Sequence, residues 1–257
     1  MNPAAMGLQL YTVRTAELEV EALLAAVAAA GYDGVETVGT QGVEPARLRA
    51  ALDETALTLA SAHVALSALR DDAPGVAATH RVLGTPLIVV PWLDPTDRPS
   101  DEHGWAELGR ELGGIATALA DAGIPLAYHH HDFELAGLGD TDGLTVLAEA
   151  AGPDRVSLEL DTGWLLRVGH DPAAWLARWG ARVTRLHVKD LRSGDDPPWV
   201  DVGDGELDLS AVVAAASATG VPWLIVEHDA PSDPLATMQR SAAALAAALG
   251  RAAPQMR

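Results

Sequence analysis

The amino-acid sequence alternates between short β-prone apolar runs and longer stretches rich in Ala and Leu. Eight runs have the composition of buried strands: 7–11, 34–38, 58–64, 86–92, 125–131, 156–161, 183–190 and 222–229. The segments after them repeat apolar residues at helical spacing: 17–30, 43–55, 72–83, 101–122, 141–151, 172–179, 208–218 and 233–249. Eight strand–helix units without a break in composition predict an α/β protein, a (β/α)8 TIM barrel forming one domain over 1–257.

An open, doubly wound sheet is the alternative arrangement of alternating strands and helices. A nucleotide-binding protein of that kind has a Gly-rich phosphate loop after an early strand. The sequence contains neither GxGxxG nor GxxxxGK[ST]. The barrel is therefore the favoured prediction.

Charge and composition exclude several functional classes. The 36 acidic and 17 basic residues give a formal charge of −19, which disfavours a nucleic-acid partner because such binding relies on Lys and Arg contacts to phosphate. The absence of cysteine excludes disulfides and thiolate chemistry. No apolar run approaches the roughly 20 residues of a membrane span, and the N-terminus lacks a signal-peptide pattern. We expect a soluble cytoplasmic protein with no membrane partner.

Polar residues gather where the predicted strands end. In a TIM barrel these ends converge on one face, which carries the active site. Buried carboxylates without partners cost several kcal/mol, so a cation at the centre would relieve that cost. The residues at these ends are Gln9, Tyr11, Glu36, His63, Trp92, His129 to Glu134, Glu159, Asp161, His187, Lys189, Asp190 and Glu227 to Asp229.

Strand alternation selects three of these residues as candidate metal ligands. In LELD, RLHVKD and LIVEHD, the polar positions occupy one strand face and the apolar positions the other. Asp161, His187 and Glu227 therefore point into the barrel from three successive strands. Such an oxygen and nitrogen ligand set suits Mn²⁺, Mg²⁺, Co²⁺ or Zn²⁺. Alternation also places His129 and His131 on one face and His130 on the other.

An ordered set of short motifs resembles a known superfamily. GLQLYTVR, GYDGVE, SAH, AYHHHDFE, LELDTGW, LHVKD, VGDGELD and VEHD follow one another between Gly7 and Asp229. Together they resemble the xylose isomerase-like TIM barrel superfamily, in particular its sugar phosphate isomerase/epimerase branch, which includes inosose dehydratases. The motifs identify the superfamily rather than one substrate.

The resemblance implies a divalent metal, with Mn²⁺ the first choice, held by Glu, Asp, His and Glu from consecutive late strands. Asp161, His187 and Glu227 match the last three ligands. The first falls on Tyr128, a poor ligand because its phenol must lose a proton of pKa about 10. We expect Glu134 to be the fourth ligand, with one of the histidines or water as the alternatives.

The same resemblance implies an isomerase or epimerase that acts on a sugar or keto-sugar through an enediolate. The alternatives are a dehydratase of a keto-cyclitol or keto-sugar, and a catalytically silent barrel subunit. An endonuclease of abasic DNA shares the barrel, but the negative charge and Trp164, where a ligand histidine would stand, oppose it. The expected catalytic residues are Glu227, Glu134, His131 and Lys189, and the expected substrate contacts are His63, Glu36, Trp164 and Trp92. The expected partner is a small sugar or cyclitol, and a homodimer is one assembly we consider.

Overall fold

A closed barrel of eight parallel strands forms the centre of the computed structural model, which describes residues 4–251. Going round the barrel, each strand pairs with its neighbours, and β12 closes the ring against β1. The (β/α)8 prediction is confirmed. The barrel strands are β1 (Ala5–Gln9), β2 (Gly34–Val38), β3 (Thr58–His63), β4 (Ile88–Val90), β5 (Leu126–His129), β8 (Val156–Asp161), β9 (Val183–Val188) and β12 (Trp223–Val226).

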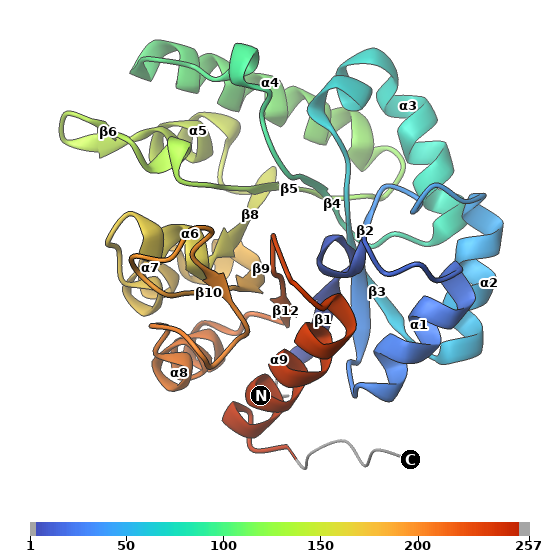
Figure 1. Ribbon diagram of the computed structural model, residues 1–257. Coiled ribbons are helices and arrows are strands. Elements are labelled where there is room, and N and C mark those ends of the chain that lie inside the picture. The colour runs from blue at the N-terminus through green and yellow to red at the C-terminus, as the bar shows by residue number, and fades with distance from the viewer. Residues whose placement is uncertain (1–3, 252–257) are drawn as a thin grey trace.

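Helices surround this barrel (Figure 1). They are α1 (Val20–Ala29), α2 (Pro45–Thr55), α3 (Leu66–Leu83), α4 (Glu102–Ala120), α5 (Gly143–Ala151), α6 (Thr162–Arg167), α7 (Pro172–Trp179), α8 (Leu209–Thr219) and α9 (Pro234–Ala248). Aspartates begin several of them: the side chains of Asp101, Asp142, Asp171 and Asp233 each accept a backbone N–H of the first turn. Short 3₁₀ turns lie at Leu10–Val13, Pro95–Asp97, Phe133–Leu135 and Gly180–Arg182.

The apolar core fills the space between strands and helices. Helix α4 packs closely against α5 because two glycines face it. A Cβ atom on Gly109 would lie 2.3 Å from the carbonyl oxygen of Leu147, and one on Gly113 would lie 2.7 Å from that of Ala151. Backbones at this distance leave no room for a side chain, so the apolar residues of this layer stay close-packed.

The structure adds elements that the sequence pattern did not predict. Helix α3 begins six residues before the predicted start at 72, and a kink at Asp72 separates the extra turn from the predicted part. Helix α6 was not predicted. Two small hairpins were also missed: β6 (Gly137–Leu138) with β7 (Thr141–Asp142), and β10 (Asp190–Leu191) with β11 (Trp199–Val200).

Several barrel strands end earlier than predicted. Strand β1 stops at Gln9, β5 at His129 and β12 at Val226, so Tyr11, His131 and Glu227 lie on the connections beyond them. These connections still leave the barrel at its C-terminal end, where a TIM barrel carries its active site. Across residues 4–251, no helix has the length and apolar character needed to cross a membrane.

Candidate active site

A cavity of about 530 Å³ opens at the C-terminal end of the barrel. Its volume is in the range of small-molecule sites. The lining residues are Tyr11, Val38, His63, Pro91, Trp92, His129, His131, Trp164, Glu227 and Asp229. Five of the predicted site residues therefore share one cavity: His63, Trp92, His131, Trp164 and Glu227.

Three of the four predicted metal ligands lie together beside this cavity, with a histidine rather than Glu134 as the fourth member of the group. His129, Asp161, His187 and Glu227 each offer a ligand atom, and these atoms all lie within 4.8 Å of one another. All four residues are buried. Thus, in this structure, His129 is the β5 residue that lies beside Asp161, His187 and Glu227.

Two atoms of this group have no hydrogen-bond partner in the described structure: Asp161 Oδ2 and His129 Nδ1. The other oxygen of Asp161, Oδ1, accepts the Trp164 N–H at 2.9 Å and so caps helix α6. Burial, followed by the effect of His187, lowers the pKa of His129 well below its ordinary value, so its ring is neutral and can offer a lone pair. An unpaired carboxylate oxygen and a neutral imidazole fit a divalent cation.

The three consecutive histidines have different environments, as strand alternation predicts. His129 and His131 line the cavity, whereas the ring of His130 accepts the Asp161 N–H at 3.0 Å through Nε2. His130 therefore fixes the backbone of Asp161. Burial, together with the charge of Lys189, lowers the pKa of His131 to about 3, so its ring is also neutral.

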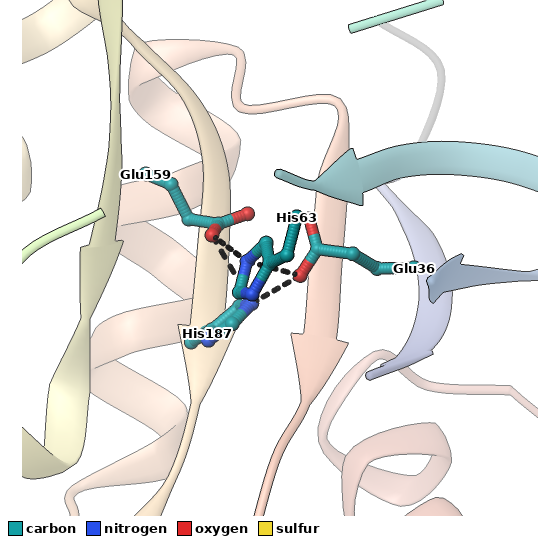
Figure 2. A group of neighbouring side chains, drawn as sticks. All are labelled: Glu36, His63, Glu159 and His187. Atoms are coloured by element: carbon teal, nitrogen blue, oxygen red, sulfur yellow. Dashed lines mark hydrogen bonds and ion pairs between the residues drawn. The ribbon is translucent and has the colours of Figure 1, made fainter. Parts of the chain in front are cut away.

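A second group of candidate ligands shares His187 with the first and adds Glu36, His63 and Glu159 (Figure 2). His187 Nε2 lies 2.6 Å from Glu36 Oε2, while its Nδ1 lies 3.0 Å from Glu227 Oε2. His63 Nε2 lies 2.8 Å from Glu159 Oε2 and 3.0 Å from Glu36 Oε2. The imidazole of His187 is therefore held between a carboxylate of the second group, Glu36, and a carboxylate of the cavity lining, Glu227, which fixes its orientation.

Glu36 contacts protein groups through both of its oxygens. Oε1 accepts the hydroxyl of Ser61 at 2.5 Å, and Oε2 accepts the amide of Gln9 at 2.7 Å. Burial alone would raise the pKa of Glu36, but His63 and His187 hold it well below its usual range. Its side chain is fully buried and is not among the residues that line the cavity. The substrate contact predicted for Glu36 stays a prediction, and this geometry favours a supporting role.

Glu134 belongs to neither group of candidate ligands in the described chain. The hydroxyl of Tyr128 donates to its Oε1 at 2.7 Å, and the His131 N–H donates to its Oε2 at 2.8 Å. Burial raises the pKa of Glu134 to about 7 and that of Tyr128 well above its usual range. Tyr128 thus keeps its proton and holds Glu134 at a position outside the cavity lining.

Lys189 lies between three carboxylates with only 1% of its surface exposed. Its Nζ is 2.8 Å from Glu227 Oε2, 2.9 Å from Asp229 Oδ1 and 3.3 Å from Asp161 Oδ2. Burial would lower the pKa of Lys189, but these carboxylates hold it above its usual range. The group is an ammonium ion at physiological pH.

Sequence reasoning gave several residues of the site no particular role. His129 was included only among the histidines that were the alternative to Glu134 as fourth ligand, although His129 and Glu159 both stand at strand ends on the inward face. Gln9 and Ser61 support Glu36, and no periodic pattern distinguishes them from other polar strand residues. Trp199 packs against Trp164 with ring centroids 4.7 Å apart, and it lies on the hairpin that was not predicted.

The chain is thus a closed (β/α)8 barrel whose buried carboxylates and imidazoles could hold a cation beside a small-molecule cavity. Residues 24–248 match the family model described as "Xylose isomerase-like TIM barrel". The chain belongs to this family.

Several proteins are similar to this chain over most of its length. An inosose dehydratase of Lacticaseibacillus casei is 27% identical over 249 residues, with 83% of each chain covered. The chain is also similar to a sugar phosphate isomerase/epimerase of Parabacteroides distasonis, with a TM-score of 0.82, 21% identity and coverage of 97% of this chain and 96% of that one. An L-ribulose 3-epimerase gives a TM-score of 0.74 at 16% identity, covering 96% of this chain and 95% of that one. At 21% and 16% identity, the likeness to these two structures shows a shared fold.

Proposed function

We propose that the protein is a divalent-metal-dependent enzyme that removes a proton next to the carbonyl group of a sugar or keto-cyclitol. The observation that carries this proposal is the group His129, Asp161, His187 and Glu227, with two unpaired ligand atoms at the small-molecule cavity. These four residues would hold the ion, with Mn²⁺ the first choice. A bound divalent cation would act as a Lewis acid on the substrate carbonyl and so acidify the neighbouring C–H bond.

The residues of the chain would bind the substrate and move the proton. Glu227 is the base we favour, because it is the carboxylate that both belongs to the ligand group and lines the cavity. Trp92 and Trp164 offer apolar faces to the sugar ring. The imidazole of His131 comes from the connection after β5, and its Nδ1 has no hydrogen-bond partner among the described residues, so its ring would donate an N–H to a hydroxyl of the substrate. Both ring nitrogens of His63 contact Glu36, Glu159 and Gln9, so His63 would contribute to the cavity wall rather than donate.

Among the reactions that share an enediolate, we favour loss of water from a keto-cyclitol or keto-sugar. The carboxylates of the cavity lining, Glu227 and Asp229, lie on one connection, and imidazoles face them. This asymmetry suits a base on one side and a donor to a leaving hydroxyl on the other. The likeness to an inosose dehydratase over 83% of the chain supports the same choice.

Isomerisation or epimerisation is the second candidate. It is favoured by the likeness of the fold to sugar isomerases and epimerases. Epimerisation by two carboxylates would need a second one across the substrate, and Tyr128 and the His131 N–H hold Glu134 outside the cavity lining. We therefore place this reaction behind dehydration.

The test is incubation of keto-inositols and 3-keto-sugars with the Mn²⁺-loaded protein in D₂O, followed by removal of the metal and NMR. A dehydratase gives an unsaturated or diketone product, and an epimerase gives a deuterated epimer of the substrate. The Asp161→Ala and His187→Ala variants should retain no metal after desalting and show turnover reduced at least about a thousandfold. Full activity of metal-free Asp161→Ala protein would overturn the proposal. A metal-loaded wild type with no solvent exchange would instead indicate a silent subunit.

A further inference from the structure

The chain contains a single lysine, and it lies inside the barrel. Sixteen of the 17 basic residues are arginines, and the remaining one is Lys189. Arginine thus provides the positive charge at every other basic position. An ammonium is a compact charge on a flexible stem, whereas a guanidinium is a planar fork. The lysine at this one buried position suggests that the site needs a small cation on a flexible stem.

The position of Lys189 connects the ligand group with a carboxylate outside it. Its Nζ contacts Asp161 and Glu227, which belong to the group, and Asp229, which does not. Asp161 Oδ2 lies 3.3 Å from this ammonium yet accepts no hydrogen bond from any described residue. The ammonium therefore balances the charge of Asp161 without satisfying its oxygen.

The side chain of Lys189 lies beside Gly163, Trp164 and Trp199. Its Nζ lies 5.2 Å from the ring centroid of Trp164 and 5.0 Å from that of Trp199. A Cβ atom on Gly163 would lie 2.7 Å from Lys189 Cγ. A side chain at position 163 would collide with this stem, so Gly163 leaves the room that Lys189 occupies.

We propose that Lys189 is a built-in counter-ion of the metal centre, which neutralises Asp161 and Glu227 in the metal-free protein and shifts toward Asp229 when a divalent cation binds. The role rests on the metal centre of the proposed function, whichever reaction follows. The catalytic role expected for Lys189 stays a prediction, and its three carboxylate contacts support the counter-ion role. Lys189 then acts as a positioning residue that lowers the cost of buried charge and sets the affinity for the cation.

Metal affinity is the first test. Isothermal titration with Mn²⁺ compares the wild type with Lys189→Met, which removes the competing charge and should tighten Kd by about tenfold or more. Arg167→Met is the matched control, because the Arg167 guanidinium lies 5.7 Å from the Trp164 ring and 5.9 Å from the Trp199 ring but pairs with Asp132. It should change Kd by less than about twofold. Asp229→Asn alone should weaken Mn²⁺ binding. The same substitution should weaken Mn²⁺ binding less when Lys189→Met is already present.

The single lysine allows a direct second test that needs no variant at this position. Lysine labelled with ¹³Cε and ¹⁵Nζ gives one side-chain signal, and saturation with diamagnetic Mg²⁺ should shift it in the wild type but not in Asp161→Ala. Cation binding with an unmoved signal, or with an unchanged Kd in folded Lys189→Met, would overturn the counter-ion role alone. A wild type that bound no divalent cation would overturn the metal-dependent function as well.

Discussion

At the scale of single residues, Tyr128 separates this site from the ligand pattern that the motifs imply. It occupies the β5 position at which the resemblance expects a metal-binding glutamate. The hydroxyl instead binds Glu134, a carboxylate that burial keeps at a pKa of about 7. In the folded protein Glu134 therefore holds its proton in a pH range where the unfolded chain, with an ordinary pKa of 4.5, has lost it. Stability contributed by this group falls as pH rises from about 4.5 to about 7.

Removing the hydroxyl of Tyr128 should therefore cost more at high pH than at low pH. Tyr128→Phe should lower the free energy of unfolding by about 1 kcal/mol at pH 5.5 and by about 1.5–3 kcal/mol at pH 8.5, where the acceptor is ionised. Tyr32→Phe is the matched control, because the Tyr32 hydroxyl donates to the neutral carbonyl of Met238 at 2.9 Å. Urea denaturation of both metal-free variants measures the difference. The loss of free energy of unfolding in Tyr128→Phe should exceed that in Tyr32→Phe by an amount that grows with pH. A difference that stayed constant with pH would contradict this account of Glu134.

The site residues that could be predicted were those whose inward orientation follows from the two-residue alternation of a strand. Asp161, His187 and Glu227 follow from alternation, because the apolar partners between them must face the helices. Alternation also separates His129 from His130, but it does not choose between His129, His131 and Glu134 as the fourth member of the group. The Tyr128–Glu134 hydrogen bond, which holds Glu134 away from the group, joins residues six positions apart through side chains and leaves no trace in hydrophobic periodicity.

At the scale of elements, Asp190 organises the connection that follows β9. Its Oδ1 accepts the N–H groups of Leu191 and Leu207, and its Oδ2 accepts those of Gly203 and Gly205. A Cβ atom on Gly205 would lie 2.2 Å from Asp190 Oδ1, which explains a glycine in VGDGELD. The same connection carries Trp199 to Trp164, a residue of the cavity wall.

Loss of the Asp190 carboxylate should loosen this connection. Asp190→Ala leaves four backbone donors without their acceptor and should lower the free energy of unfolding by about 2–4 kcal/mol. Hydrogen exchange should rise across 199–207, while the far side of the barrel is unaffected. Asp208→Ala is a suitable control, because the Asp208 carboxylate accepts one N–H, that of Ala211, at the start of α8. Unchanged exchange in Asp190→Ala would show that the hairpin holds its shape without the carboxylate.

The large elements were predictable and the small ones were not, for a physical reason. Strand and helix periods repeat over enough residues to be read from the sequence in the eight main units. Helix α6 is only six residues long, and tertiary contacts set its start: Asp161 caps it, and the Thr162 hydroxyl donates to the carbonyl of Lys189 at 2.7 Å and accepts its N–H at 2.9 Å. Such contacts join distant parts of the chain and leave no local signal.

At the scale of the whole molecule, the lumen of the barrel carries ionisable groups where many TIM barrels carry branched apolar ones. Glu36, Glu159, Asp161, His187 and Lys189 are all at most 1% exposed. Burial and the nearby charge of Glu36 raise the pKa of Glu159 to about 7. The stability of the barrel should therefore depend on how its central charges are balanced.

Metal removal should accordingly lower the melting temperature. At a cation concentration about 100 times Kd, binding to the folded state contributes about 2.7 kcal/mol, or about 5–10 °C for a chain of this size. Differential scanning fluorimetry with Mn²⁺ and with EDTA measures this shift. Asp161→Asn should melt at the same temperature in both conditions, and an equal shift in that variant would place the stabilising ion elsewhere.

The burial of the only lysine also determines how the protein reacts with reagents that modify side-chain amines. The 257 residues contain one side-chain amine, that of Lys189, and only 1% of this residue is exposed. It is the one lysine side chain that acylating reagents, glycating sugars, amine-directed crosslinkers and lysine-modifying enzymes could target. A reactive carbonyl compound held in the cavity would meet that amine only as an ammonium paired with carboxylates, which is not a nucleophile. An enzyme that handles keto-sugars would in this way keep its only side-chain amine from forming a Schiff base with its substrates.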